Sequence, residues 1–124
     1  MEHKEFVQTV AERANLSKEA AADLVRVTLE TLGDRLSEGE ARRLAAQLPG
    51  FLRESFPVKD RSHQFGLHDF VMRVGNRIGL TAMEATDGVR AVLTTLREAV
   101  PGDAFANAMS QLPAEFQEMA EPAP

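Results

Sequence analysis

Histidine and aspartate side chains gather near the middle of the chain, and both types can bind a divalent metal. His63 and His68 lie close together, with Asp60 and Asp69 beside them. Imidazole nitrogens and carboxylate oxygens are common ligands of such ions. A metal site needs several ligands in a fixed geometry, and no HExxH or comparable spacing places two of them on one helix face. We therefore predict no metal ligand, and a metal-dependent enzyme using His63, His68 and Asp69 stays as one alternative function.

An Asp-x-x-Arg pair occurs twice, as Asp23 with Arg26 and as Asp87 with Arg90. Residues three positions apart are neighbours on a helix surface, so an ion pair is the structural interpretation. Two equivalent arginines could instead clamp a carboxylate or a phosphate, because a guanidinium group binds either one with two parallel hydrogen bonds. We favour the structural interpretation, since repeated residues are expected where a fold is repeated.

Two further arginines, Arg13 and Arg77, also occupy equivalent positions. Each lies at the edge of an apolar stripe. We expect their aliphatic stems to cover apolar surface and their guanidinium groups to bind carbonyl oxygens at a helix end.

Basic residues concentrate in the middle of a chain whose net charge is −5. Residues 41–97 hold nine bases and five acids, whereas residues 98–124 hold five acids and no base. The negative total disfavours nucleic acid as a partner, and the positive middle favours an acidic protein, a second copy of the chain included. The candidate interaction surface consists of the densest like charges, which are Arg42, Arg43, Arg53, Lys59 and Arg61.

No recognisable catalytic or cofactor motif occurs in the sequence. It has no cysteine, no GxSxG, no glycine-rich phosphate loop and no Rossmann fingerprint. No nucleophile paired with a base can be located either. We therefore predict no catalytic residue and no cofactor, which favours a non-enzymatic protein.

The chain is a tandem repeat. The segment 3–54 aligns with the segment 67–118 without a gap, and 16 of the 52 positions are identical. A repeat of this length is a supersecondary unit that needs its copy to bury an apolar face. We expect one domain over residues 1–124, with repeats at about 3–55 and 67–120, a connection at 56–66 and a tail at 121–124.

Apolar residues recur at helical spacing in both copies, and no segment alternates with a period of two. We therefore predict an all-α fold in which two four-helix repeats pack as one domain with a pseudo-two-fold axis. Ser17, Thr81 with Glu84, and Ser37 with Glu40 have the spacing of helix N-caps, the last two pairs as capping boxes. In the connection, Phe56, Val58 and Phe65 are expected to anchor the chain to the core. Pro101 is expected in the first turn of a helix, while Pro49 and Pro113 are expected to end the third helix of each repeat and permit a short fourth.

Short motifs in both copies resemble a known family. They are Ala45-Ala46-Gln47-Leu48-Pro49-Gly50-Phe51-Leu52-Arg53, Arg90-Ala91-Val92-Leu93, Leu96-Arg97 and Gln111-Leu112-Pro113. Together they resemble the bacterial domain of unknown function 2267 family, over nearly the whole chain. The resemblance implies a soluble, wholly helical, two-repeat bacterial protein and transfers no catalytic residue. Family members often carry a Tyr and Gly-Trp stretch after the first repeat, where this chain has Phe56-Pro57-Val58.

These observations favour a helical protein-interaction or adaptor module. An anionic ligand or nucleic-acid binding domain is the first alternative, and a metal-dependent enzyme is the second. The charged start and the absence of an apolar run long enough for a membrane span lead us to expect a cytoplasmic location without membrane contact.

Overall fold

The computed structural model describes residues 1–54, 56 and 65–121, and over these residues the chain is all-helical with no strand. In chain order the helices are α1 (His3–Ala14), α2 (Lys18–Arg35), α3 (Glu38–Gln47), α4 (Gly50–Arg53), α5 (Leu67–Ile78), α6 (Ala82–Ala99), α7 (Gly102–Met109) and α8 (Ala114–Met119). The predicted all-α fold class is confirmed. None of the helices in the described ranges is long and apolar enough to cross a lipid bilayer.

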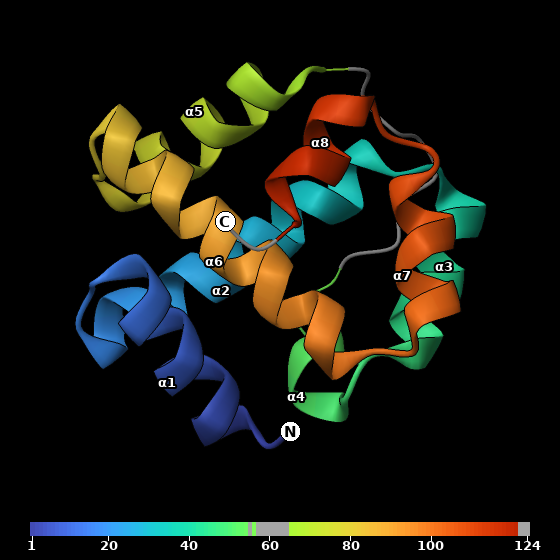
Figure 1. The fold of residues 1–124 in the computed structure, drawn as a ribbon, viewed down its shortest axis with the longest axis horizontal. Helices are drawn as coiled ribbons and strands as arrows, with labels where there is room; N and C mark the ends of the chain where they lie inside the picture. Colours follow the sequence, from blue (N-terminus) through green and yellow to red (C-terminus); the bar gives the residue numbers. More distant parts are fainter. Residues whose placement is uncertain (55, 57–64, 122–124) are drawn as a thin grey trace.

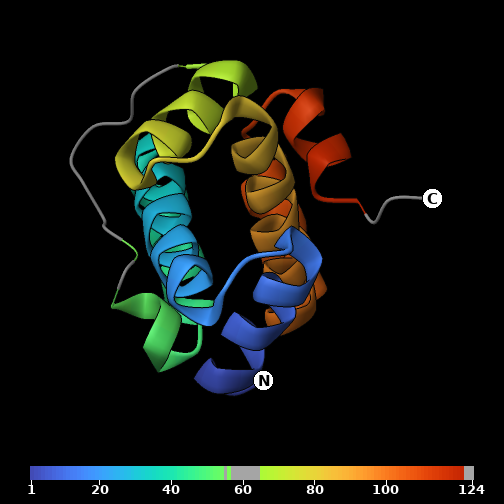
Figure 2. The same ribbon diagram turned by 90° about the vertical axis from the view of Figure 1, so that its left-hand side faces the viewer.

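The two longest helices, α2 and α6, pack against each other at the centre of the molecule (Figure 1). Helix α1 packs against both α2 and α6, and so does α5. Figure 2 shows α1 and α5 near opposite ends of the central pair. Helices α3 and α7 form a second pair, while α8 covers part of α6. Because α1 and α5 each bridge both central helices, residues from distant parts of the sequence meet along α2 and α6.

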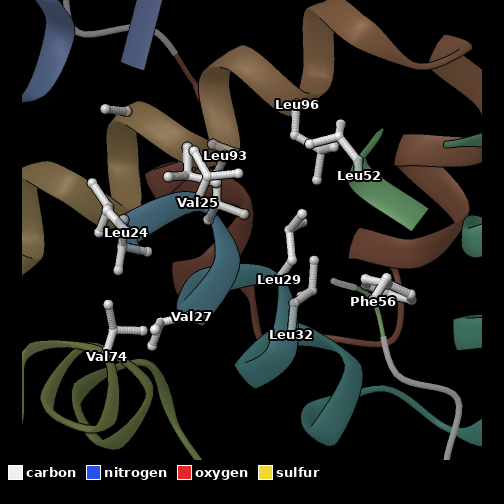
Figure 3. Packing of buried hydrophobic residues seen from close by; sticks show 14 of the residues in the cluster. Leu24, Val25, Val27, Leu29, Leu32, Leu52, Phe56, Val74, Leu93 and Leu96 are labelled. Carbon is white, nitrogen blue, oxygen red and sulfur yellow. The ribbon is translucent and has the colours of Figure 1, made fainter. Parts of the chain in front are cut away.

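The predicted apolar stripes are buried in this arrangement. Leu29 and Leu32 of α2 and Leu93 of α6 have no exposed surface. Figure 3 shows Leu29 and Leu32 facing the same interior as Leu52 and Phe56. Burying a leucine side chain contributes roughly 1.5–3 kcal/mol, so these positions are major sources of stability.

The connection between the copies is anchored as expected at its two described ends. Phe56 and Phe65 are 5% and 7% exposed. Val58, the third expected anchor, lies outside the described residues.

Helices α2 and α6 approach each other closely at Gly88. Leu24 is fully buried there, and a Cβ atom at Gly88 would lie 2.9 Å from Leu24 Cδ2. Carbon atoms pack at about 3.5–4.0 Å, so only a residue without a side chain fits against Leu24 without movement. Leu24 and Gly88 occupy equivalent positions in the two aligned sequence copies.

Side-chain caps begin both central helices, as the sequence predicts. Ser17 Oγ accepts a hydrogen bond from the Ala20 N–H at 3.2 Å. Thr81 and Glu84 form the reciprocal capping box, with bonds of 3.1 Å from the Glu84 N–H to Thr81 Oγ1 and 2.9 Å from the Thr81 N–H to Glu84 Oε1. The bond from the Thr81 backbone N–H holds the pKa of Glu84 below its usual range, because it stabilises the carboxylate.

The predicted capping box at Ser37 is only half right. Ser37 Oγ accepts from the Glu40 N–H at 3.3 Å, but the Ser37 N–H donates to Gln111 Oε1, also at 3.3 Å. Glu40 instead lies 3.5 Å from Arg43. Because α3 packs against α7, the side chain of Gln111 just beyond α7 reaches Ser37 and takes the place that the sequence gives to Glu40.

Prolines mark three helix starts. Pro49, Pro101 and Pro113 are the N-cap residues of α4, α7 and α8, so Pro101 immediately precedes α7, whereas the sequence suggested the first helical turn. A proline has no N–H to leave unsatisfied at a helix start, which explains its tolerance there.

Candidate functional site

A groove between α1 and α6 brings together charged residues from both sequence copies. Its volume is about 570 Å³, and we call it the α1–α6 groove. The residues lining it are Arg13, Asp87, Arg90, Ala91, Thr94, Arg97 and Glu98. Positions 87, 90, 94 and 97 recur every three or four residues, so they share one face of α6. Arg13 projects from the last turn of α1 onto that face.

Arg13 is held in the groove by four contacts to α6. Its Nη1 lies 2.6 Å from Glu98 Oε2, 3.1 Å from Thr95 Oγ1 and 3.4 Å from Thr94 Oγ1. Its Nη2 donates to Glu98 Oε1 at 3.1 Å. The hydrogen bond between these side chains raises the pKa of Arg13 and lowers the pKa of Glu98, since it favours both charged forms.

The other two arginines of the groove are unengaged. In the part of the chain that the structure describes, the guanidinium groups of Arg90 and Arg97 form no hydrogen bond and no ion pair. The Asp87–Arg90 ion pair suggested by the sequence is therefore not formed. Three arginines against Asp87 and Glu98 give the lining a net formal charge of +1.

The equivalent positions of the other copy are arranged differently. There, successive ion pairs link four residues, which we call the α2–α5 cluster: Asp23, Arg26 and Glu30 of α2, and Arg77 of α5, which pairs with Glu30. Glu30 Oε2 lies 2.7 Å from Arg77 Nη2, and Glu30 Oε1 lies 3.3 Å from Arg26 Nη1. Arg26 also lies 3.7 Å from Asp23, as the sequence predicts.

Arg13 and Arg77 both differ from the sequence-based expectation. Their guanidinium groups bind carboxylate and hydroxyl oxygens on another helix, not helix-end carbonyls. The reason is that α1 packs across α6 and α5 across α2, which brings polar side chains within reach.

The candidate surface predicted from the sequence is partly described by the structure. Arg42 lies 2.6 Å from Glu38, and Arg43 lies 3.5 Å from Glu40, so both side chains are paired along α3. Arg53 donates to two backbone carbonyl oxygens at the end of α3, those of Ala45 at 3.1 Å and Leu48 at 2.9 Å.

The other two members of that surface, Lys59 and Arg61, lie outside the described residues.

Only two of the four residues considered for metal binding are described by the structure. His63 and Asp60 are not described, while His68 and Asp69 are exposed at the start of α5. Among the described residues, no three histidine, aspartate or glutamate side chains are grouped so as to hold a metal ion.

The α1–α6 groove was not predicted, although two of its arginines were noted. The available signal was a local break in the repeat: Glu30 corresponds to Thr94, and Gly33 corresponds to Arg97. Both changes make the second copy more positive at positions that share a helix face. The arrangement is suited to binding an anion, because guanidinium groups from two helices face one cavity.

A family model covers most of the chain. It is described as Uncharacterized conserved protein (DUF2267) and matches residues 3–119. A comparison with curated proteins found no significant match.

Proposed function

We propose that this chain, which belongs to the DUF2267 family of uncharacterized conserved proteins, is a non-enzymatic recognition module that binds an acidic segment of a partner protein in the α1–α6 groove. The observation that carries the proposal is the convergence of Arg13, Arg90 and Arg97 on one cavity, with two of the three guanidinium groups unengaged within the described ranges. An acidic partner would complete their hydrogen bonds and neutralise their charge.

The chemistry of the lining supports recognition over catalysis. It includes no serine, cysteine, histidine or lysine. Its hydroxyl group, Thr94 Oγ1, donates to the backbone carbonyl of Arg90 at 2.9 Å, so it is not poised against a base. Its carboxylates are Asp87 and Glu98, and Glu98 is bound by Arg13, so the two do not form an acid–base pair facing the groove. The arginine side chains supply binding and orientation.

We also infer that the chain is one domain of two tandem four-helix repeats related by a pseudo-two-fold axis. The helix bounds support it, because α1 to α4 begin at positions 3, 18, 38 and 50, and these align with positions 67, 82, 102 and 114, where α5 to α8 begin. Packing is reciprocal too, since α1 contacts α6 while α5 contacts α2. Helices α1 and α5 end at left-handed residues in equivalent positions, Asn15 with φ 56° and Gly79 with φ 71°.

Charge reversal in the groove tests the proposed function. The probe is a fluorescent peptide of alternating glutamate and glycine, with binding followed by anisotropy. Arg90→Glu combined with Arg97→Glu should weaken binding by roughly tenfold or more, since close opposite charges become like charges. The matched control, Arg42→Glu combined with Arg43→Glu, changes the same number of arginines on α3 and should bind like the parent. Thermal melts establish that both variants fold.

Two outcomes would contradict the proposal. If the α3 reversal abolishes binding and the groove reversal does not, the surface predicted from the sequence is the contact. If the parent binds duplex DNA more tightly than the peptide, with a steep dependence on salt, the nucleic-acid alternative gains the support instead.

A further inference from the structure

The α1–α6 groove and the α2–α5 cluster use the same arginine positions, but only in the cluster does one carboxylate bridge both arginines. In the groove, Glu98 binds Arg13 alone. In the aligned copies Arg13 corresponds to Arg77, and Arg90 corresponds to Arg26. Glu30 lies between Arg26 and Arg77 in the cluster, whereas the equivalent residue of the groove is Thr94. The molecule therefore contains the same arginine pair twice. We call the α2–α5 cluster the filled version, because the carboxylate of Glu30 lies between its arginines, and the α1–α6 groove the unfilled version, because Thr94 takes that position.

The filled version defines what such an arginine pair binds. The carboxylate of Glu30 bridges two helices, with one oxygen 2.7 Å from Arg77 and the other 3.3 Å from Arg26. Its side chain is 28% exposed, so this contact is partly shielded from water. A carboxylate that gives one oxygen to each of two guanidinium groups is held by position as well as by charge.

We propose that the α1–α6 groove is a carboxylate clamp, in which Arg13 and Arg90 hold a glutamate or aspartate side chain of a bound peptide above Thr94, where Glu30 stands in the α2–α5 cluster. The inference rests on the proposed function, since it specifies how the same groove recognises an acidic segment. The ligand is a single carboxylate.

The unfilled arrangement has donors to spare. A guanidinium group carries five N–H donors, and the contacts of Arg13 within the described residues involve only Nη1 and Nη2, so the Nε–H remains available. Glu98 and Thr95 hold Arg13 over α6 before any ligand arrives, which lowers the entropy lost on binding. Arg90 contributes a guanidinium group with no partner in the described region.

Charge favours a carboxylate over a phosphate. The groove lining carries a net formal charge of +1, which one carboxylate neutralises. A phosphate monoester carries about −1.5 to −2 at pH 7 and would leave excess negative charge beside Asp87 and Glu98. Arg97, which stands where the other copy has Gly33, adds attraction at the end of the groove without a counterpart in the filled cluster.

Filling the clamp from within tests the inference. Thr94→Glu recreates Glu30 in the groove, so it should abolish binding of the glutamate–glycine peptide and leave the thermal melt unchanged or raised. Thr94→Gln is the matched control: it adds the same volume without the charge, and it should retain more of the binding. Peptide binding by Thr94→Glu at the parental affinity would overturn the clamp.

Emptying the filled cluster provides a gain of function. Glu30→Thr frees Arg77 and leaves Arg26 with its 3.7 Å contact to Asp23, and it should create a second peptide site, weaker than the first because Gly33 replaces Arg97. Titration calorimetry should then give two sites per chain in place of one. A single site of unchanged affinity in Glu30→Thr would also overturn the inference, and this result does not depend on Thr94→Glu being folded.

Competing probes separate this inference from the proposed function. If inorganic phosphate displaces the peptide and N-acetylglutamate amide does not, the clamp fails while recognition of anions in the groove survives. If N-acetylglutamate amide binds as tightly as the peptide and Thr94→Glu abolishes both, the clamp holds and the proposed peptide partner is replaced by a small carboxylate. If none of these probes binds the parent protein, both proposals fail.

Discussion

The contact between Gly88 and Leu24 predicts that Gly88→Ala destabilises the protein when residue 24 is leucine and stabilises it when residue 24 is alanine. In Gly88→Ala the new methyl group would lie 2.9 Å from Leu24 Cδ2, 3.0 Å from Cδ1 and 3.5 Å from Cγ. Two of these distances are about 0.5 Å or more below normal carbon contact. Leu24 is fully buried and has no solvent to move into, so the strain stays in the core.

The magnitude follows from two opposing effects. Alanine favours a helix interior over glycine by about 1 kcal/mol, while overpacking a core costs about 1–3 kcal/mol. We expect Gly88→Ala to lower the free energy of unfolding by about 1 kcal/mol. Leu24→Ala alone should cost about 2–5 kcal/mol, as core leucines do. In that background the clashing atoms are gone, and Gly88→Ala should stabilise by about 1 kcal/mol.

The assay is a double-mutant cycle on the full chain, with urea unfolding at one pH and temperature. The expected coupling free energy is about 2 kcal/mol, within the range for residues in contact. Gly39→Ala is the control glycine, since it is helical and exposed and a Cβ there meets no atom within 4 Å. It should stabilise both backgrounds equally. Equal stabilisation by Gly88→Ala in both backgrounds would refute the reasoning about the α2–α6 crossing.

Two further predictions concern stability. Leu29→Ala and Leu93→Ala should each lower the free energy of unfolding by about 2–5 kcal/mol in urea melts, because both side chains are fully buried; melts within error of the parent would mean that the α2 or α6 register is wrong. Glu84→Gln keeps a capping side chain and removes the charge, so the parent should be more stable near neutral pH. Since the folded pKa of Glu84 lies below the unfolded value of about 4.3, that advantage is present above this pH and lost as pH falls through the folded pKa. Thermal melts at pH 7 and pH 3 check it, and an equal gap at both pH values would argue against the capping charge.

The helices and the core were readable from the sequence because both depend on local periodicity. Apolar residues spaced three and four apart place Leu29 and Leu93 on the inner faces of α2 and α6, and both are buried. The cap at Ser17 and the box at Thr81 involve residues three apart, so the sequence contains both partners. The repeat supports the prediction further, because both copies show the same apolar spacing at equivalent positions.

The partners of polar groups were less predictable because they depend on which helices pack together. The Ser37 N–H binds Gln111, 74 residues away, and Arg13 binds Glu98, 85 residues away. Helical periodicity places a side chain on a face but does not say which helix covers that face. Arg53, which the sequence assigned to an interaction surface for its charge, also binds two backbone carbonyls at the end of α3, and the sequence did not predict these bonds. The groove was missed for the same reason, since its lining comes from α1 and α6.

The stability of the two arginine arrangements is consistent with a recognition role for the groove. A glutamate at position 94 would give Arg13 and Arg90 the ion pairs that Glu30 gives Arg77 and Arg26, so the fold alone offers no reason to prefer threonine. Arg90 and Arg97 are two turns apart on α6, about 10 Å, so their mutual repulsion is modest at physiological salt. The unpaired state of Arg90 and Arg97 in the described structure therefore lowers the stability only slightly, while it keeps a positive groove open to a carboxylate. Natural proteins often give up stability at binding sites in this way. A raised thermal melt of Thr94→Glu together with its loss of peptide binding would display that exchange in a single variant.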